Sequence, residues 1–505
     1  MIVVAKIGGL VACVGLAALL AGVRREHRLA GLVAIAAGFV AMAVYLLPEA
    51  SLALLVGGVV AGGLVAAAGT WVLLRQPYLL AFATLACIPI RVPVDVGSEK
   101  VNLLVPLYGV IAALWLALAS QLVRGDSRTR ELGPIALPLA AVVAWTGVTV
   151  LWTDDPRKGA IFLAAFVVPF GLLAVGIARL PWRGRYLTWL WAALVGTALA
   201  YALVGAYQWI TRDVFWNPGV IVSNTYAPFF RVNSVFWDPS VYGRYLAAAI
   251  LVTLAGILLG GAAGRRVVGL YAIAVATWFG LLISFSQSSF VALAAGIAVA
   301  VAVAWGRRAV VGVVALGAVA AAVTFAVPQV REQIVDRADS GFTKVTSGRS
   351  NLVAEGVRIF AGHPAHGVGT GGFAKEYSRR HGLVGAQQRR GVSHTTPVTI
   401  AAEQGVLGLA LYGWLLVAVI LATLRRLGRG FTSRVSLAVG TVLVAIAVHS
   451  LFYGAFFEDP TTWALLGLVG LVARVPKKPP PAGAPLSEDY APPDVPASPE
   501  IETSA

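Results

Sequence analysis

Long apolar segments recur along the whole chain and are separated by short polar ones. Nearly all are long enough to cross a ~30 Å hydrocarbon core as a helix. We predict spans near residues 3–22, 30–47, 51–74, 76–90, 102–123, 134–151, 159–180, 187–210, 239–260, 268–284, 288–305, 309–328, 397–424, 435–455 and 460–474. The run 76–90 is short and is also consistent with a re-entrant segment. The pattern predicts an all-α polytopic membrane protein with about 12–15 transmembrane helices.

Composition supports this class. Of the 505 residues, 58% are hydrophobic and 12% are charged, whereas soluble domains are about half apolar and a quarter charged. Cys13 and Cys87 both lie in apolar runs, which favours a packing role over a disulfide framework. The first apolar run has no basic segment before it and is followed by further spans, so we expect no signal peptide.

Basic residues gather in loops on one side of the predicted spans. Cytoplasmic loops carry an excess of lysine and arginine, so this side is predicted to be cytoplasmic. The net charge of +16 is largely this bias and does not imply nucleic acid. The loops are Arg24-Arg25-Glu26-His27-Arg28, 124–130, Arg183 with Arg185, Arg265-Arg266, Arg307-Arg308, 425–434 and Lys477-Lys478.

One long polar segment, residues 329–396, then faces outward and breaks the charge bias. It holds ten lysines and arginines against five aspartates and glutamates, and four of the six histidines. A membrane protein that gathers cationic and titratable side chains in one external loop is predicted to handle an anionic ligand there.

The chain accordingly divides into five predicted parts. Residues 1–210 are N-terminal transmembrane helices, and 211–328 are transmembrane helices with an external loop that contains Arg231. Residues 329–396 are the large external catalytic loop, and 397–474 are C-terminal transmembrane helices. The proline-rich, polar residues 475–505 are predicted to form a disordered cytoplasmic tail.

Candidate chemistry begins between residues 230 and 246. Asp238 followed by Pro239 predicts a helix N-cap and first turn. Arg231 precedes them in the external loop, where an ordinary solvated charge is the alternative to a functional role. Arg244 lies about one and a half turns into the span. An arginine there is by default a functional candidate, although it could also extend to the outer interface.

A second candidate segment runs from residue 348 to 373. Arg349 and Arg358 lie on a predicted helix that ends near His363-Pro364, and a glycine-rich stretch follows. The glycines could approach a ligand closely or simply turn the chain. His363 and His366 are spaced like a metal pair, but no third ligand is adjacent. We therefore expect no metal site and no cofactor.

The third candidate segment runs from residue 391 to 408. Thr396 is predicted to cap a helix that Pro397 opens, which places His394 at the helix mouth. The positive end of the helix dipole favours an anion at that position. Glu403 falls about two turns into the span, where an unpaired acid is costly.

Paired acids occur twice more, and other enzyme signatures are missing. Asp154-Asp155 and Glu458-Asp459 each precede a proline and a new span, so helix capping is the expected role. The sequence has no Walker-type phosphate loop, no dinucleotide fingerprint and no Cys/His cluster with zinc spacing. A metal-dependent nucleotide-sugar enzyme is therefore disfavoured.

Taken in order, these segments resemble the O-antigen ligase and polymerase family of integral membrane glycosyltransferases. The resemblance covers roughly residues 220–470. The matching residues are Arg231 with Asp238-Pro239; Gly348-Arg349; His363-Pro364 with Gly367-Val368-Gly369-Thr370-Gly371-Gly372-Phe373; His394; and Glu403-Gln404-Gly405-Val406-Leu407-Gly408.

The resemblance implies a GT-C-like fold and a reaction on the outer face. The donor would be a glycan on undecaprenyl pyrophosphate, held in membrane lipid. The acceptor would be a hydroxyl on another glycan, a lipid or a protein. Catalytic roles are implied for His394, Arg231 and Arg349, and substrate-binding roles for Arg244, Arg358, Glu403 and His363.

The chemistry of these residue types agrees with that function. Arginine stabilises a pyrophosphate leaving group without a metal, and histidine accepts a proton near neutral pH. We expect a polysaccharide ligase slightly more than a polymerase. The alternatives are a protein O-oligosaccharyltransferase and a transporter of anionic lipid or glycan.

Overall fold

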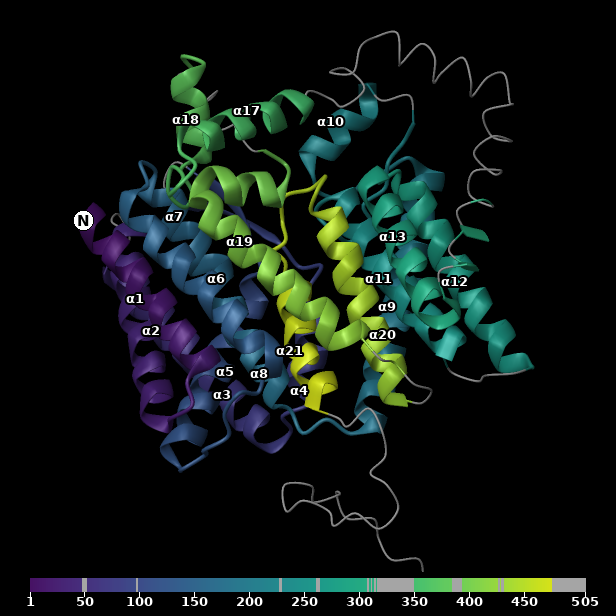
Figure 1. Ribbon diagram of the computed structural model, residues 1–505, viewed down its shortest axis with the longest axis horizontal. Coiled ribbons are helices and arrows are strands. Elements are labelled where there is room, and N and C mark those ends of the chain that lie inside the picture. The colour runs from purple at the N-terminus through teal and green to yellow at the C-terminus, as the bar shows by residue number, and fades with distance from the viewer. Residues whose placement is uncertain are drawn as a thin grey trace, which may run out of the picture.

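The computed structural model describes residues 1–47, 52–96, 99–226, 229–259, 264–306, 349–383, 393–425 and 431–474, together with 308, 309, 311, 312, 315 and 427. Within these residues the chain is an all-α bundle, as predicted, with a single two-stranded sheet (Figure 1). Eleven helical segments of this part are long and apolar enough to cross a membrane. The protein is therefore a multi-pass membrane protein.

The N-terminal half contains α1 (Ile2–Ala21), α2 (Arg25–Leu46), α3 (Leu52–Arg75), α4 (Leu79–Cys87), β1 (Val92–Val96), β2 (Glu99–Leu103), α5 (Val105–Val123), η1 (Gly133–Ile135), α6 (Ala136–Thr149), η2 (Val150–Trp152), α7 (Pro156–Phe162), η3 (Leu163–Val167), α8 (Val168–Arg179) and α9 (Gly184–Thr211). The remainder contains α10 (Pro218–Tyr226), α11 (Pro239–Leu259), α12 (Arg265–Ser284), α13 (Gln287–Trp305), α17 (Arg349–Gly362), α18 (Phe373–Arg380), α19 (Thr396–Leu424), α20 (Phe431–His449) and α21 (Pro460–Arg474).

The eleven spans differ from the prediction at identifiable places. The run 76–90 forms α4, whose nine residues reach only about 14 Å at 1.5 Å per residue. The chain then turns back through the hairpin β1–β2, with Val94 opposite Val101. The 460–474 run forms the shorter helix α21, and the 51–74 run, which lies in α3, is also not among the eleven. The predicted span 309–328 and the tail 475–505 lie outside the described residues, apart from 309, 311, 312 and 315.

The two ends of the helix bundle carry different polar segments. Helices α10, α17 and α18 lie at one end, which we call the loop end (Figure 1). Basic loops meet at the opposite end, which we call the basic end. There Arg25 donates from Nε to the Leu122 carbonyl oxygen at 2.5 Å. A buried network joins α2 to α8 at Glu131, which pairs with Arg28 of α2 at 2.6 Å and with Arg179 of α8. Arg179 also pairs with Asp126 at 2.6 Å.

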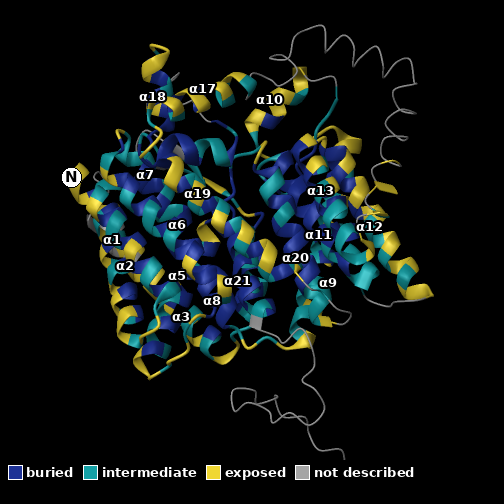
Figure 2. Ribbon diagram, viewed as in Figure 1, coloured by how far each residue is buried: buried dark blue, intermediate teal, exposed yellow. Residues whose placement is uncertain are grey.

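Buried residues concentrate where the helices face one another, and many residues on the outer sides of the bundle are exposed (Figure 2). Large apolar residues are among the exposed ones. Val33, Leu203 and Val275 are 68%, 72% and 64% exposed on α2, α9 and α12. Apolar surface on this scale is typical of helices that contact lipid. Cys13 and Cys87 are buried and free, as expected.

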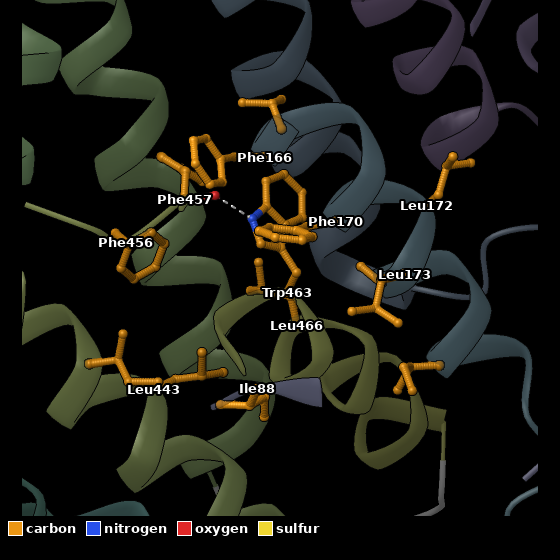
Figure 3. Close-up of a cluster of buried hydrophobic side chains, with 14 of the residues drawn as sticks. Ile88, Phe166, Phe170, Leu172, Leu173, Leu443, Phe456, Phe457, Trp463 and Leu466 are labelled. Carbon is orange, nitrogen blue, oxygen red and sulfur yellow. Dashed lines mark hydrogen bonds between the residues drawn. The ribbon is translucent and has the colours of Figure 1, made fainter. Parts of the chain in front are cut away.

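An aromatic cluster fixes the segment between α20 and α21. Trp463 is fully buried, and its Nε1 donates to the Phe457 carbonyl oxygen at 2.9 Å (Figure 3). Phe456 and Phe457 meet edge to face at 5.0 Å, and Phe457 also contacts the Trp463 ring at 5.8 Å. Such ring pairs contribute about 0.5–1.5 kcal/mol each beyond burial. They hold residues 450–459 against the candidate site.

Candidate functional site

A glycine-rich loop packs into a break in helix α19. We call residues 363–372, which join α17 to α18, the glycine loop. Helix α19 is interrupted at Gly405, where φ is 71° and ψ is −167°. The break frees the Ala402 and Glu403 carbonyl oxygens, which accept the Val368 and Gly369 N–H groups at 2.9 and 2.8 Å. The loop thereby supplies the hydrogen bonds that the broken helix lacks.

Glu403 completes this attachment through its side chain. One carboxyl oxygen accepts the Gly371 N–H at 2.9 Å, and the other accepts the Phe373 N–H at 3.1 Å. The acid that is costly inside a span is therefore satisfied by backbone donors. The sequence predicted a substrate contact for Glu403. The structure gives it the loop amides as partners and also places it on the wall of a cavity.

Two positions show why the glycine loop has glycines rather than larger residues. Gly369 has a φ of +87°, and a Cβ there would lie 2.5 Å from Thr153 Cα. Gly371 has a φ of +81°, and a Cβ there would lie 2.5 Å from the Gly159 nitrogen. The glycines therefore turn the chain, as one of the two predictions had it, and they let the loop approach the protein's own backbone closely. A close approach to a ligand stays a prediction.

Beside the glycine loop lies a cavity of about 330 Å³, which we call the inner cavity. Its apolar wall comes from phenylalanines of α7, η3 and the segment before α21. Its polar wall joins residues far apart in the sequence. The polar lining residues include Lys158, Ser393, Thr399, Glu403 and Glu458. A cavity with an apolar wall and a few convergent polar groups is the usual form of a small-molecule site.

His394 stands at the edge of this cavity. It directly precedes the N-cap of α19, is half-buried, and has a left-handed backbone with φ of +56°. Its neighbours Ser393 and Thr396 both line the inner cavity. The backbone of Gly454, also on the cavity wall, packs against it, because a Cβ on Gly454 would lie 3.6 Å from His394 Cα.

Hydrogen bonds on both sides hold His394 in this position. The Thr396 N–H donates to the Ser450 carbonyl oxygen at 2.9 Å, and Thr395 Oγ1 donates to the Leu451 carbonyl oxygen at 3.0 Å. Ser393 Oγ and Thr399 Oγ1 are 2.5 Å apart. Helix α19 begins at Thr396 with Thr395 as its N-cap, so the predicted cap at Thr396 was wrong by one residue.

Arg244 is paired rather than extended to the interface. The Arg244 side chain is 6% exposed, and its Nη2 lies 2.6 Å from Asp459 Oδ2. Asp459 also accepts the Thr461 N–H at 2.9 Å, which confirms its predicted capping role. Asp238 accepts the Ser240 N–H at 2.7 Å, which confirms the cap of α11.

Arg231 lies at the loop end between α10 and α12. Its N–H donates to Asn224 Oδ1 at 3.0 Å, and its Nε donates to the Ser284 carbonyl oxygen at 3.4 Å. Asn224 Nδ2 returns a bond to the Arg231 carbonyl oxygen at 2.9 Å. Arg231 is therefore held in place, but it is not among the described residues that line the inner cavity.

The predicted residues of α17 and its end are dispersed. Arg349 opens α17, and its side chain lies outside the described part of the chain. The Arg358 side chain is 72% exposed and pairs with Glu355 at 3.1 Å. His363 lines a second, more polar cavity of about 530 Å³ on the other side of the glycine loop. The structure therefore places Glu403 on the wall of the inner cavity, His394 next to residues of that wall, and His363 on the wall of the other cavity.

Two cations near the inner cavity were missed by the sequence analysis. Lys158 lines the cavity from α7, and its Nζ lies 3.9 Å from Asp155 Oδ2. The positive charge of Arg91 is close enough to Glu458 to favour the ionised form of its carboxyl group. Burial raises the pKa of Glu458 to about 7, against the opposing effects of Arg91 and Arg244. Lys158 could have been noticed as a basic residue that breaks the charge bias on the predicted outer side.

A comparison with known protein families gives a match over part of the chain. Residues 272–413 match the family model described as O-antigen ligase. The chain contains an O-antigen ligase domain. The match takes in the glycine loop, His394 and the broken first half of α19, and it confirms the resemblance to the O-antigen ligase and polymerase family. The protein is a membrane enzyme of the ligase or polymerase kind, which transfers glycans. No curated protein sequence matches the chain significantly.

Proposed function

We propose that this O-antigen ligase domain transfers a glycan from undecaprenyl pyrophosphate to an acceptor hydroxyl on the outer face of the plasma membrane. The observation that carries the proposal is the position of His394, at the mouth of α19 and beside Ser393, which lines the inner cavity together with Lys158. A ligase that acts on a glycan or lipid acceptor is slightly preferred over a polymerase.

In this mechanism His394 accepts the proton of the acceptor hydroxyl as that oxygen attacks the first sugar carbon of the donor. The bond from this carbon to the pyrophosphate oxygen breaks, and the electron pair leaves with the pyrophosphate. A single displacement inverts the anomeric centre. The acceptor proton ends on the imidazole, and the leaving group departs as an anion.

Fixed cations stabilise the leaving pyrophosphate as its charge grows. Among the described residues Lys158 lines the inner cavity, and Arg244, which pairs with Asp459, acts on the charge of Glu458 in the cavity wall. We assign Arg231 and Arg349 to the donor pyrophosphate as well, with Arg358 as a weaker contact. Because guanidinium and ammonium groups provide the positive charge, the proposed mechanism requires no metal.

The proposed orientation follows from charge. The basic end, with the loops around Arg25, Arg128 and Arg179, would face the cytoplasm. The loop end, with α17, α18 and the inner cavity, would then face outward, where a lipid-linked donor and a polar acceptor can meet.

A transporter is less consistent with the broken helix. Transporters use the carbonyl groups freed by a helix break to coordinate ions or substrate. At Gly405 the freed Ala402 and Glu403 carbonyl oxygens already accept the Val368 and Gly369 N–H groups. A protein O-oligosaccharyltransferase remains the alternative acceptor class, since it uses the same donor chemistry.

Reconstitution tests the proposal directly. The purified protein in liposomes should transfer a glycan from an undecaprenyl-pyrophosphate donor to an added acceptor, and chelators should leave the rate largely unchanged. Arg231→Ala should reduce the rate strongly, and Arg231→Lys should be impaired because lysine lacks the bidentate geometry. Wild-type transfer by the folded Arg231→Ala and Arg349→Ala variants would refute the leaving-group assignment.

Labelling of intact cells tests the orientation. In a background that lacks Cys13 and Cys87, an impermeant thiol reagent should modify a cysteine introduced at Ser340 and spare one at Ser487. The reverse pattern would place the cavity on the wrong side of the membrane for this reaction.

A further inference from the structure

The second cavity is a built feature of the loop end that the proposed transfer step does not use. We call this space of about 530 Å³ the outer cavity. The glycine loop separates it from the inner cavity, since Gly371 and Phe373 line the inner one while Gly367 and Gly372 line the outer one. Its side-chain lining includes Trp152, Asp154, His363, His366, Glu376 and Arg379.

The walls of the outer cavity come from distant parts of the chain and are tied together. Trp152 Nε1 donates to the His366 carbonyl oxygen at 3.3 Å, and the two rings meet edge to face at 5.9 Å. Lys375 Nζ donates to the Asp154 carbonyl oxygen at 2.6 Å. The segment before α7 is thereby joined to α18, so the cavity is part of the fold rather than a gap between loops.

The lining offers an aromatic ring beside hydrogen-bond donors and hydrogen-bond acceptors. Trp152 is half-buried and Asp154 is exposed. Glu376 is buried, and its oxygens accept Arg379 and Arg380 at 2.6 and 2.7 Å. The Arg379 side chain remains 68% exposed, so part of its guanidinium is accessible to a ligand. Donors, acceptors and an apolar ring thus surround one space.

This chemistry fits a sugar and fits the other substrates poorly. Sugar rings present hydroxyl groups that both donate and accept, and C–H faces that pack on aromatic rings. A prenyl chain would meet the charged side chains of Asp154, Glu376 and Arg379 in a lining whose apolar side chains are Trp152 and Val368. A pyrophosphate would be repelled by two carboxyl groups of the lining, those of Asp154 and Glu376, and attracted by one guanidinium group, that of Arg379. The volume lies within the roughly 300–1,000 Å³ range of small-molecule sites.

We propose that the outer cavity is a glycan-binding subsite, which holds uncharged sugar residues remote from the bond that is transferred. Whether these sugars belong to the acceptor or to the donor depends on the proposed function, but the binding itself does not. Trp152 provides the stacking surface, and Asp154 and Arg379 provide the hydrogen bonds.

Direct binding tests this subsite without transfer. The probe is a lipid-free oligosaccharide released by mild acid from the host's own envelope polysaccharide. It is titrated into the full-length protein in nanodiscs, and saturation-transfer NMR reports which sugar protons contact the protein. Trp152→Ala and Asp154→Asn should each raise the Kd about three- to tenfold, the size of one ring contact or one hydrogen bond. Trp152→Phe should recover most of the affinity.

Matched variants and competitors make the result specific. Trp216→Ala and Asp213→Asn change the same residue types at exposed loop-end positions outside the cavity, and should leave the Kd unchanged. Inorganic pyrophosphate should not displace the oligosaccharide. Displacement by pyrophosphate, or an unchanged Kd in the folded Trp152→Ala and Asp154→Asn variants, would overturn the subsite. Displacement by a serine-rich peptide would assign the cavity to a protein acceptor instead, and would also overturn it.

Kinetics then assign the glycan. Trp152→Ala should raise KM for one substrate about three- to tenfold and leave kcat within about twofold. A rise for the acceptor or for the donor identifies which chain occupies the cavity. A fall in kcat with both KM values unchanged would indicate a merely structural role and contradict the subsite. Loss of transfer in His394→Ala with normal oligosaccharide binding would leave the subsite supported, so the two proposals fail separately.

Discussion

Glu403 provides the most informative single substitution, because its two proposed roles give opposite results. If Glu403 holds the glycine loop, as its contacts with Gly371 and Phe373 indicate, then Glu403→Ala should loosen residues 367–373 and destabilise the protein. If Glu403 mainly contacts substrate, the same change should raise KM and leave stability unaltered.

The magnitude follows from the two hydrogen bonds of 2.9 and 3.1 Å. Removing the carboxyl group leaves two backbone N–H groups without an acceptor. An unsatisfied buried donor costs about 1–3 kcal/mol, so the loss should be about 2–6 kcal/mol. Glu403→Gln keeps one acceptor oxygen but points an NH₂ group at the second N–H, so we expect an intermediate loss.

Hydrogen exchange measures this loss at the loop itself. Amide protection in peptides covering residues 367–375 should fall in Glu403→Ala, and thermal unfolding in detergent should shift downward. Glu355→Gln is the matched control, because the Glu355 side chain is 6% exposed and pairs with Arg358 rather than with backbone amides. The control should leave protection of the glycine loop unchanged.

The reasoning is refuted if Glu403→Ala keeps wild-type protection and melting temperature while KM rises. A loop that stayed ordered without Glu403 would be held by its other hydrogen bonds, such as those of Val368, Gly369 and Thr370. Glu403 would then return to the substrate-binding role that the family resemblance implied.

Three further results are expected. Breaking the buried Arg244–Asp459 pair by Arg244→Ala or Asp459→Asn should destabilise the protein by about 3–5 kcal/mol in chemical unfolding, because one buried charge is left unpaired. If replacing both residues by apolar ones gives a protein no more stable than the single variants, the loss does not come from the unpaired charge. The pKa of Glu458 is raised to about 7, so its carboxyl is neutral below that pH and ionised above it. An ionised Glu458 would repel the donor pyrophosphate, so the donor KM should rise as the pH increases through 7. This pH dependence should vanish in Glu458→Gln, and its persistence in that variant would show that another group causes it. Gly369→Ala should cost about 1–3 kcal/mol from overpacking against Thr153, with unchanged melting showing that the contact can relax.

Much of the fold was predictable because the period and length of apolar runs determine membrane helices. The caps at Asp238 and Asp459 were also predictable, since each acid precedes a proline at the start of a helix. The hairpin β1–β2 was not predicted. Its residues follow an apolar run that is too short to span, and hydropathy alone does not indicate where such a run turns back.

The site was only partly predictable because its contacts join distant segments. The position of His394 just before α19 was predictable from the sequence, and its catalytic role stays a prediction. The Arg244–Asp459 pair and the Trp152 side of the outer cavity depend on how helices pack. Nor does a sequence show that the break at Gly405 is occupied by the glycine loop, since glycine inside a span is often only a packing residue.

The central claim is that His394 accepts the acceptor proton, and the rate of glycan transfer by His394→Ala in reconstituted liposomes tests it most directly. A general base contributes roughly 10²–10⁴-fold, so the variant should lose activity by that factor while expression and donor binding stay near normal. His363→Ala, His366→Ala and His381→Ala should each lose far less. If His394→Ala transfers glycan at the wild-type rate while His366→Ala or His381→Ala does not, the account has assigned the wrong histidine.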